Sequence, residues 1–176
     1  MRATAEAIRV EPEPYGSEGP QWLVARAEAE LVARYGGLDA CELGLTAAMF
    51  EPPRGSFLVA RVDCEHAASP QRPVGGVGLR RLPDGVGEVR RLWVEPSRRG
   101  RGVGRALMAW LEGSALELGF ERVVLATGDR QPEAVQLYQA TGWTRLYVDP
   151  EGKPLAAGWI RFAKAIGRRS APTSRH

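Results

Sequence analysis

The sequence predicts a mixed α/β fold, of the α+β kind, in which one sheet carries helices on both faces. Three strand-like segments follow one another at residues 57–62, 74–82 and 86–94, which predicts an antiparallel meander. From residue 103 onward helical and strand-like segments alternate, a pattern typical of a sheet covered by helices. The 176 residues are enough for one domain with a sizeable core.

Apolar spacing and chain-breaking residues define the individual elements. Leu23, Ala27 and Leu31 recur at helical spacing, and Gly36 ends that helix. Pro132 suits the first turn of another helix. The expected helices are 21–35, 43–50, 103–118 and 132–141. The expected strands are 8–10, 57–62, 74–82, 86–94, 122–127, 143–148 and 159–163.

The composition is that of a globular protein, with 44% hydrophobic and 26% charged residues. The formal net charge is +3, and Arg168, Arg169 and Arg175 account for this excess. The basic balance is therefore no evidence for a nucleic-acid partner. We expect a single domain over residues 1–166 and a disordered polar tail over residues 167–176.

Cysteine and histidine are scarce. Cys41 and Cys64 do not have the spacing of metal ligands, and His66 and His176 are the only histidines, so no metal site is expected. The first ten residues lack the apolar stretch of a signal peptide, and no segment approaches the ~20 apolar residues of a membrane span. We expect a cytoplasmic protein with reduced thiols and no membrane partner.

A glycine- and arginine-rich turn at residues 98–105 is the most informative stretch of the chain. It follows a strand and opens a helix, so its backbone N–H groups are available to an anion, and its glycines let a phosphate approach them. The turn lacks the Gly-Lys-Ser/Thr ending of a P-loop and the G-x-G-x-x-G spacing of a dinucleotide fold.

Residues 99–104 instead read R-x-x-G-x-G, which resembles the acyl-CoA pyrophosphate loop of the GNAT N-acetyltransferase superfamily. The segments 87–96 and 134–143 also resemble GNAT segments at the expected distances from this loop. So do residues 57–60, 74–78 and 125–128. On these motifs in order, which span residues 57–147, the chain is identified as a member of this acetyl-CoA-dependent superfamily.

The resemblance implies a mostly antiparallel sheet of about seven strands, splayed at its centre and flanked by about four helices. Pantetheine would lie in the splay and hydrogen-bond the backbone of Leu92, Trp93 and Val94, with the Leu92 N–H near the acetyl carbonyl. Leu92 and Val94 can also be core residues, because these contacts are main-chain. The pyrophosphate would bind the loop residues Arg99, Gly100, Arg101, Gly102, Val103, Gly104 and Arg105.

The resemblance also implies the catalytic side chains. Tyr138 is the expected general acid toward the coenzyme sulfur, and a packed core tyrosine is the alternative. Glu88 is the expected general base. It lies four residues before Leu92 on the same strand, and side chains at even spacing point to the same face of a sheet, so its carboxylate would point toward the site. An exposed strand glutamate is the alternative for Glu88. Gln131, where the family often has Asn, and Ala134 complete the cofactor-binding set.

The expected reaction is transfer of an acetyl group from acetyl-CoA to a primary amine of a small molecule, by direct attack in a ternary complex. A peptide or protein amine is the second candidate acceptor. A non-catalytic acyl-CoA-binding sensor is the alternative from another class. The binding site for the acceptor would be shaped by residues 21–50, by the loop after residue 127 and by residues 147–159. The sequence is compatible with a homodimer but does not specify one.

Overall fold

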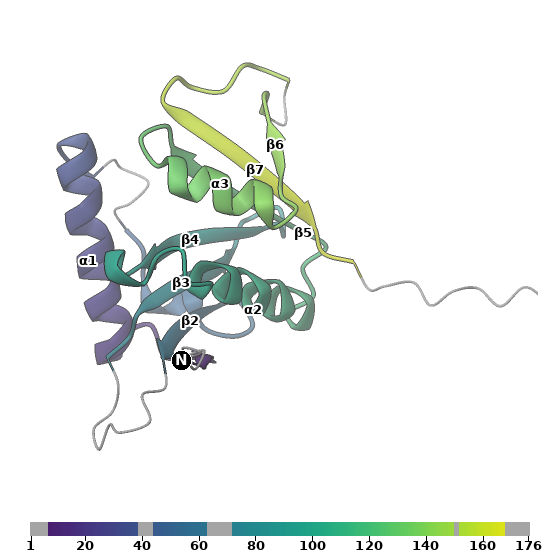
Figure 1. The fold of residues 1–176 in the computed structure, drawn as a ribbon. Coiled ribbons are helices and arrows are strands. Elements are labelled where there is room, and N and C mark those ends of the chain that lie inside the picture. Colours follow the sequence, from purple (N-terminus) through teal and green to yellow (C-terminus); the bar gives the residue numbers. More distant parts are fainter. Residues whose placement is uncertain (1–6, 39–43, 63–71, 150–151, 168–176) are drawn as a thin grey trace, which may run out of the picture.

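Seven strands form one sheet in the order β1-β2-β3-β4-β5-β7-β6 (Figure 1). This computed structural model describes residues 7–38, 44–62, 72–149 and 152–167. The strands are β1 (Ile8–Pro12), β2 (Gly55–Val62), β3 (Gly75–Arg81), β4 (Gly87–Val94), β5 (Arg122–Gly128), β6 (Thr144–Leu146) and β7 (Trp159–Ala165). The helices are α1 (Glu18–Tyr35), α2 (Val103–Glu117) and α3 (Pro132–Ala140), with short 3-10 turns η1 (Ala47–Phe50) and η2 (Pro96–Arg98).

The predicted meander is confirmed, because β2, β3 and β4 pair antiparallel in succession. The expectation of about four helices is corrected to three α-helices in the described part of the chain. Within the segment expected to be helical over 43–50, the described residues form only the single turn η1, and Pro52 and Pro53 prevent its extension. The strand expected over 143–148 is likewise short, since β6 ends at Leu146 and Val148 makes an isolated bridge to Pro154.

Several sequence features lie outside the described residues. They are Cys41, Cys64, His66, His176, and residues 168–176 of the expected tail.

The sheet parts at its centre. The parallel strands β4 and β5 pair only at Gly87–Val123 and Glu88–Val124. Beyond these two pairs β4 keeps its partner β3 on one side, and β5 keeps β7 on the other. The expected splay is confirmed, and it divides the sheet into two halves that are joined along a short seam.

Two hydrophobic clusters lie on opposite faces of the sheet. One packs α2 and α3 against the strands and includes Leu107, Leu111 and Tyr138. The other packs α1 and η1 and includes Leu23 and Phe50. Figure 1 shows α1 standing apart from α2 and α3. The seam between β4 and β5 is therefore approached by α1 from one side and by α2 and α3 from the other.

A β-bulge interrupts β4 just after the seam. Gly78 pairs with Arg90 and Gly76 pairs with Trp93, so one residue of β3 faces two residues of β4. Arg91 has φ 58, a left-handed conformation that is uncommon for a residue other than glycine. The bulge reverses the alternation of side chains along the strand. Trp93 then packs in the α1 cluster, whereas Leu92 packs against the α2 cluster.

We expect Leu111→Ala to lower the free energy of unfolding by about 3 kcal/mol, because Leu111 is fully buried between α2 and the sheet. Leu116→Ala is the matched control, since Leu116 lies on the same helix with 45% of its surface exposed and should cost less than about 1 kcal/mol. Urea unfolding followed by circular dichroism measures both. Equal losses would contradict the assignment of the buried face.

Candidate active site

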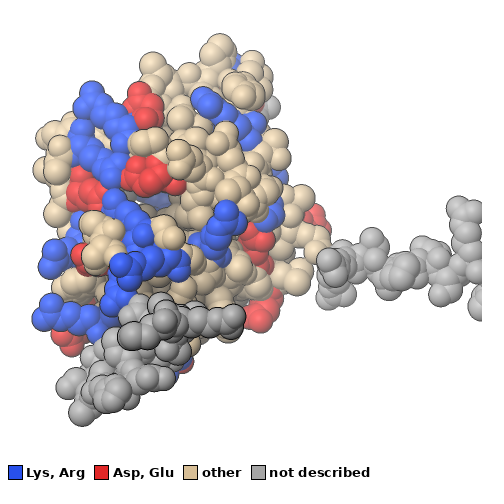
Figure 2. Space-filling model, viewed as in Figure 1, with Lys and Arg blue, Asp and Glu red and all other residues tan. Residues whose placement is uncertain are grey.

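A cavity of about 1060 Å³ opens where β4 and β5 part. Its lining residues come from α1, β4, the turn after η2, β5, α3 and the segment before β7. Figure 2 shows Lys and Arg side chains gathered with acidic ones on the α1 side of the molecule. The cavity is therefore polar at its α1 end and is continuous through the splay.

One backbone edge of β4 faces this cavity. The Glu95 N–H donates to the Val74 carbonyl at 2.8 Å, so it points toward β3. Because neighbouring N–H groups alternate in direction along a strand, those of Leu92 and Val94 point the other way, toward β5. No described strand pairs with β4 at these positions. The edge is therefore not covered by a described strand, and the Val94 carbonyl accepts a hydrogen bond from the Arg99 Nε at 2.9 Å. An extended ligand could pair with such an edge as a further strand would.

The glycine-rich turn leads directly into α2. Gly100 and Gly102 have φ of 72° and 90°, which favour glycine, and Gly102 is the N-cap of α2. The first helical bond runs from the Ala106 N–H to the Gly102 carbonyl at 3.0 Å, so the N–H groups just before Ala106 precede the helical ladder. A Cβ at Gly104 would lie 3.0 Å from Leu137, so glycine also lets α2 approach α3.

The structure brings most of the predicted cofactor-binding residues to the cavity. The lining includes Leu92, Trp93, Val94, Arg99, Gly100, Gly102, Gly104, Arg105, Gln131, Ala134 and Tyr138. Arg101 and Val103 are not among the lining residues. Arg101 is exposed, and Val103 is buried in the α2 cluster.

Tyr138 lies on the buried face of α3 and borders the cavity. Its ring centroid is 5.4 Å from that of Phe162 and 6.2 Å from that of Trp143, and only 5% of the residue is exposed. Burial raises the pKa of Tyr138 well above its ordinary value of 10. The phenol is therefore protonated at neutral pH and can act as a hydrogen-bond donor.

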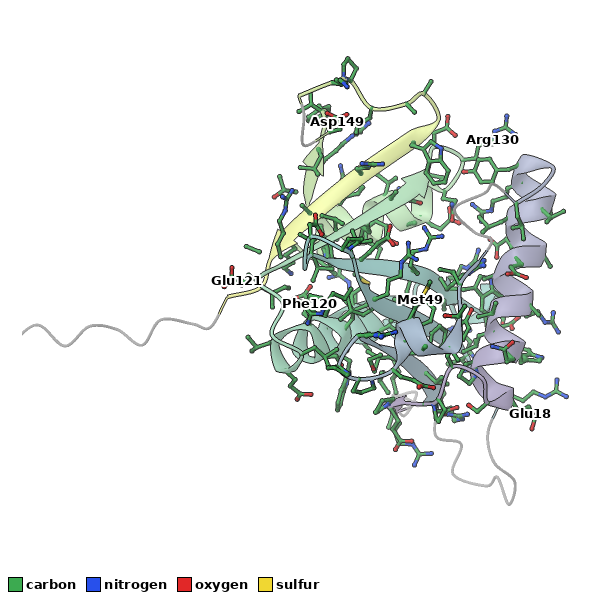
Figure 3. All side chains as sticks on the ribbon, turned by 180° about the vertical axis from the view of Figure 1, so that it is seen from behind. Glu18, Met49, Phe120, Glu121, Arg130 and Asp149 are labelled. Carbon is green, nitrogen blue, oxygen red and sulfur yellow. The ribbon has the colours of Figure 1, made fainter. Side chains whose placement is uncertain are left out.

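Glu88 is not among the residues that line the cavity, and the structure does not place its side chain on the face of Leu92 as the even spacing predicts, while its role as general base stays a prediction. The bulge lies between the two residues, so they point to opposite faces despite the even spacing. The Glu88 carboxylate instead accepts a hydrogen bond from the Arg80 Nε at 2.6 Å, on the face where Met49 packs (Figure 3). Arg80 is its direct neighbour on β3.

A cluster of charged side chains that sequence reasoning missed joins α1 to the cavity. Glu30 accepts hydrogen bonds from the Trp93 Nε1 at 2.7 Å and from Arg99 at 2.6 Å, and it pairs with Arg34 at 2.5 Å. Arg34 also pairs with Glu133 on α3. The spacing of Glu30 and Arg34 by four residues is a sequence signal for that pair. The link to Glu133 has no such signal, because it depends on how α1 and α3 meet.

The same contacts lower the pKa values of Glu30 and Glu133. Burial alone would raise the pKa of Glu30, but hydrogen bonds from Arg99 and Trp93 and the charges of Arg99 and Arg34 lower it below its ordinary value of 4.5. The pKa of Glu133 is lowered in the same way, mainly by Arg34 against the effect of burial. Both carboxylates are therefore ionised at neutral pH.

The end of α1 is anchored to the loop between β5 and α3. The Arg130 side chain donates to the Arg34 carbonyl at 2.9 Å, and the Arg34 side chain donates to the Arg130 carbonyl at 2.8 Å. Figure 3 shows Arg130 beside this end of the helix. A Cβ at Gly128 would lie 2.1 Å from the Tyr35 hydroxyl, so glycine is needed for the approach.

The comparisons with known proteins agree with this geometry. The model of the acetyltransferase (GNAT) family matches residues 14–143. A crystal structure of a GNAT acetyltransferase from Staphylococcus aureus superposes with a TM-score of 0.70 at 18% identity, covering 92% of this chain and all of the other. A GNAT acetyltransferase from Elizabethkingia anophelis with acetyl-CoA bound superposes with a TM-score of 0.59 at 17% identity, covering 90% and 97%.

Curated relatives match over shorter segments. An IAA acetyltransferase of Azospirillum brasilense is 37% identical over 59 residues, which are 34% of this chain and 39% of the relative. A mycothiol acetyltransferase of Geodermatophilus obscurus is 39% identical over 67 residues, 38% of this chain and 22% of the relative. The matches thus span well under half the length of these relatives. Because the family model covers most of the chain, this protein belongs to the GNAT acetyltransferase family, whose members are acyltransferases using acetyl-CoA.

No described helix combines the length and apolar character required to span a bilayer. Within the described residues, no group of three or more His, Cys, Asp or Glu side chains gathers in a way that could hold a metal ion. The cytoplasmic location stays a prediction from the sequence.

We expect Glu30→Gln to destabilise the fold by about 1 kcal/mol at pH 7, because it weakens three charge-assisted contacts at a partly exposed site. The folded-state pKa of Glu30 is lowered, so its contribution is complete above about pH 4.5 and is lost as the pH falls through the folded pKa. Urea unfolding at pH 7 and pH 4 measures this. The variant should differ less from the native protein at pH 4, and a difference unchanged with pH would contradict the assignment.

Proposed function

We propose that this protein transfers an acetyl group from acetyl-CoA to a primary amine of a small molecule, by direct attack in a ternary complex. The observation that carries the proposal is the edge of β4 at Leu92 and Val94, with which no described strand pairs and which lies in one cavity with the start of α2 and with Tyr138. An extended pantetheine chain suits such an edge, and a diphosphate suits the helix start.

The residues present fit the cosubstrate. The positive φ of Gly100 and Gly102 leaves the turn without side chains that would cover its N–H groups. Arg105 at the cavity wall adds charge for the phosphates, and Gln131 and Ala134 border the same space on α3. Arg99 would have to exchange its contacts with Glu30 and the Val94 carbonyl for a phosphate contact.

The chemistry assigned to this chain follows from these positions. Acetyl-CoA, when bound, supplies the acetyl group as a thioester. The Leu92 N–H donates to the acetyl carbonyl oxygen, where negative charge develops as the amine attacks. As the C–N bond forms and the C–S bond breaks, Tyr138 gives its proton to the departing sulfur and regains one from solvent.

The amine must lose a proton to react, and we propose that water in the cavity receives it. Of the three carboxylates that line the cavity, Glu30 and Glu133 are engaged by arginines and are weak bases, and Asp129 is exposed. Glu88 is not among the lining residues and is paired with Arg80 and with Arg90. Glu88→Gln should therefore retain kcat within about twofold, and a loss of roughly 100-fold would restore Glu88 as the base.

The decisive experiment measures release of the coenzyme thiol from acetyl-CoA with a panel of small amines and amine-bearing peptides. We expect turnover with small amines, and Tyr138→Phe should lower kcat by roughly 100-fold because the leaving sulfur loses its proton donor. Tyr147→Phe is the matched control, since Tyr147 is exposed, and should leave kcat unchanged. Turnover with peptides alone would favour a protein acetyltransferase, and binding without any turnover would favour a sensor.

Binding of acetyl-CoA itself is tested at the glycine turn. Gly102→Ala forces an L side chain into a left-handed conformation at the helix start, and we expect at least a tenfold weaker affinity for acetyl-CoA by calorimetry. Gly113→Ala is the control, because a Cβ there meets open space in the middle of α2. It should leave the affinity unchanged and stabilise the helix by about 0.5–1 kcal/mol. Equal affinities for both variants would contradict the proposed diphosphate site.

A further inference from the structure

The bulge in β4 places two consecutive arginines on the face of the sheet that α1 covers. Arg90 is paired with Gly78, and a Cβ at Gly78 would meet Phe50 of the α1 cluster, so Arg90 points to that face. Arg91 donates to Glu28 of α1 at 2.8 Å and therefore points the same way. In a regular strand the second of these side chains would point to the opposite face.

The cosubstrate and the arginines lie on different faces. The start of α2 and Tyr138 belong to the α2 face, where the proposed function places the diphosphate and the sulfur. Arg90 and Arg91 belong to the α1 face, and both line the same cavity. Since the cavity runs through the splay, a ligand that reaches Arg90 from the α1 side is a second molecule, and in the proposed reaction that molecule is the acceptor.

Arg90 is ion-paired with Glu88 at 3.9 Å, and an anion bound by Arg90 would have to exchange with this contact. Its residue is 9% exposed and borders the cavity, so its charge acts in surroundings that screen it less than bulk water does. Its guanidinium has the fork of donors that binds a carboxylate through two hydrogen bonds. Arg91, with 2% of its side chain exposed, is ion-paired with Glu28 and adds positive charge beside it.

Arginines outnumber carboxylates in the lining of the cavity, and Arg90 and Arg91 are paired with Glu88 and Glu28, which are not among the lining residues. Six arginines line the cavity against three carboxylates. The arginines are Arg34, Arg90, Arg91, Arg99, Arg105 and Arg130, and the carboxylates are Glu30, Asp129 and Glu133. Of these arginines, only Arg99 and Arg105 belong to the glycine turn, so the other four lie outside the proposed diphosphate site.

Resting on the proposed function, we infer that Arg90 binds a carboxylate of the acceptor, and that the acceptor is an amino acid or a similar amine that carries a carboxylate. Arg90 lies two residues before Leu92, and the bulge between them leaves both residues bordering the same cavity. A compact molecule with both groups can therefore hold its carboxylate at Arg90 while its amine reaches the acetyl carbon near the Leu92 N–H. Arg90 is a specificity-determining residue in this reaction.

The test compares each amino acid with its own amide, using thiol release from acetyl-CoA by the full chain. For the best side chain we expect kcat/KM for the free acid to exceed that for the amide by roughly 30-fold, the value of a charge-assisted contact. Arg90→Gln should remove this preference and leave the KM for acetyl-CoA within about twofold. Arg90→Lys should recover part of it. Arg130→Gln, which changes an exposed arginine of the same cavity, should keep the preference.

The possible results separate the two proposals. Turnover of amines with no preference for the acid, or with a preference for the amide, overturns the inference and leaves the acetyltransferase function standing. An equal loss for acid and amide in Arg90→Gln also overturns it, because the arginine would then act only on structure. No turnover with any amine overturns both. The acid and amide comparison in the native protein needs no variant, so it decides the matter even if Arg90→Gln does not fold.

Discussion

The parting of β4 from β5 is the constraint on which the rest of the structure depends. A strand in the middle of a sheet normally satisfies the backbone groups of both its edges, and β4 does so on the β5 side at only two residue pairs. The edge beyond them faces a cavity instead of a strand. A protein that keeps such an edge within reach of a ligand has a preformed main-chain binding site, whose geometry is set by the sheet and not by mobile side chains.

The two faces of the splay have different chemistry because different helices cover them. On the α2 face, glycines and the helix start provide backbone donors, and Tyr138 is a protonated phenol in an apolar surround. On the α1 face, buried arginines and paired carboxylates line the cavity. In the proposed reaction, this division keeps the phosphate-bearing cosubstrate and the acceptor on different faces, so that the two can be bound together and meet at the gap.

The charged cluster around Glu30 joins α1 to two other elements that line the cavity. It contacts β4 through Trp93, and it contacts α3 through Arg34 and Glu133. Arg99 belongs to this cluster and also opens the glycine turn. A phosphate that attracts Arg99 competes with Glu30 for the same guanidinium. In the proposed function, a phosphate at the glycine turn would therefore change the contact that ties Arg99 to Glu30 of α1.

The sequence by itself determined the meander, the helices after it and the location of the glycine turn, because these follow from local periodicity and from residues whose backbone preferences are strong. It also determined that Tyr138 shares a site with that turn, through motifs in order along the chain. Only the tertiary structure decided which face each β4 side chain occupies. The extra residue at Arg91 put Glu88 and Leu92 on opposite faces and brought the Arg91 side chain to the same α1 side as Arg90. The position of a bulge depends on how the strand pairs with its neighbour, here β3. The spacing of residues along β4 alone therefore cannot predict it.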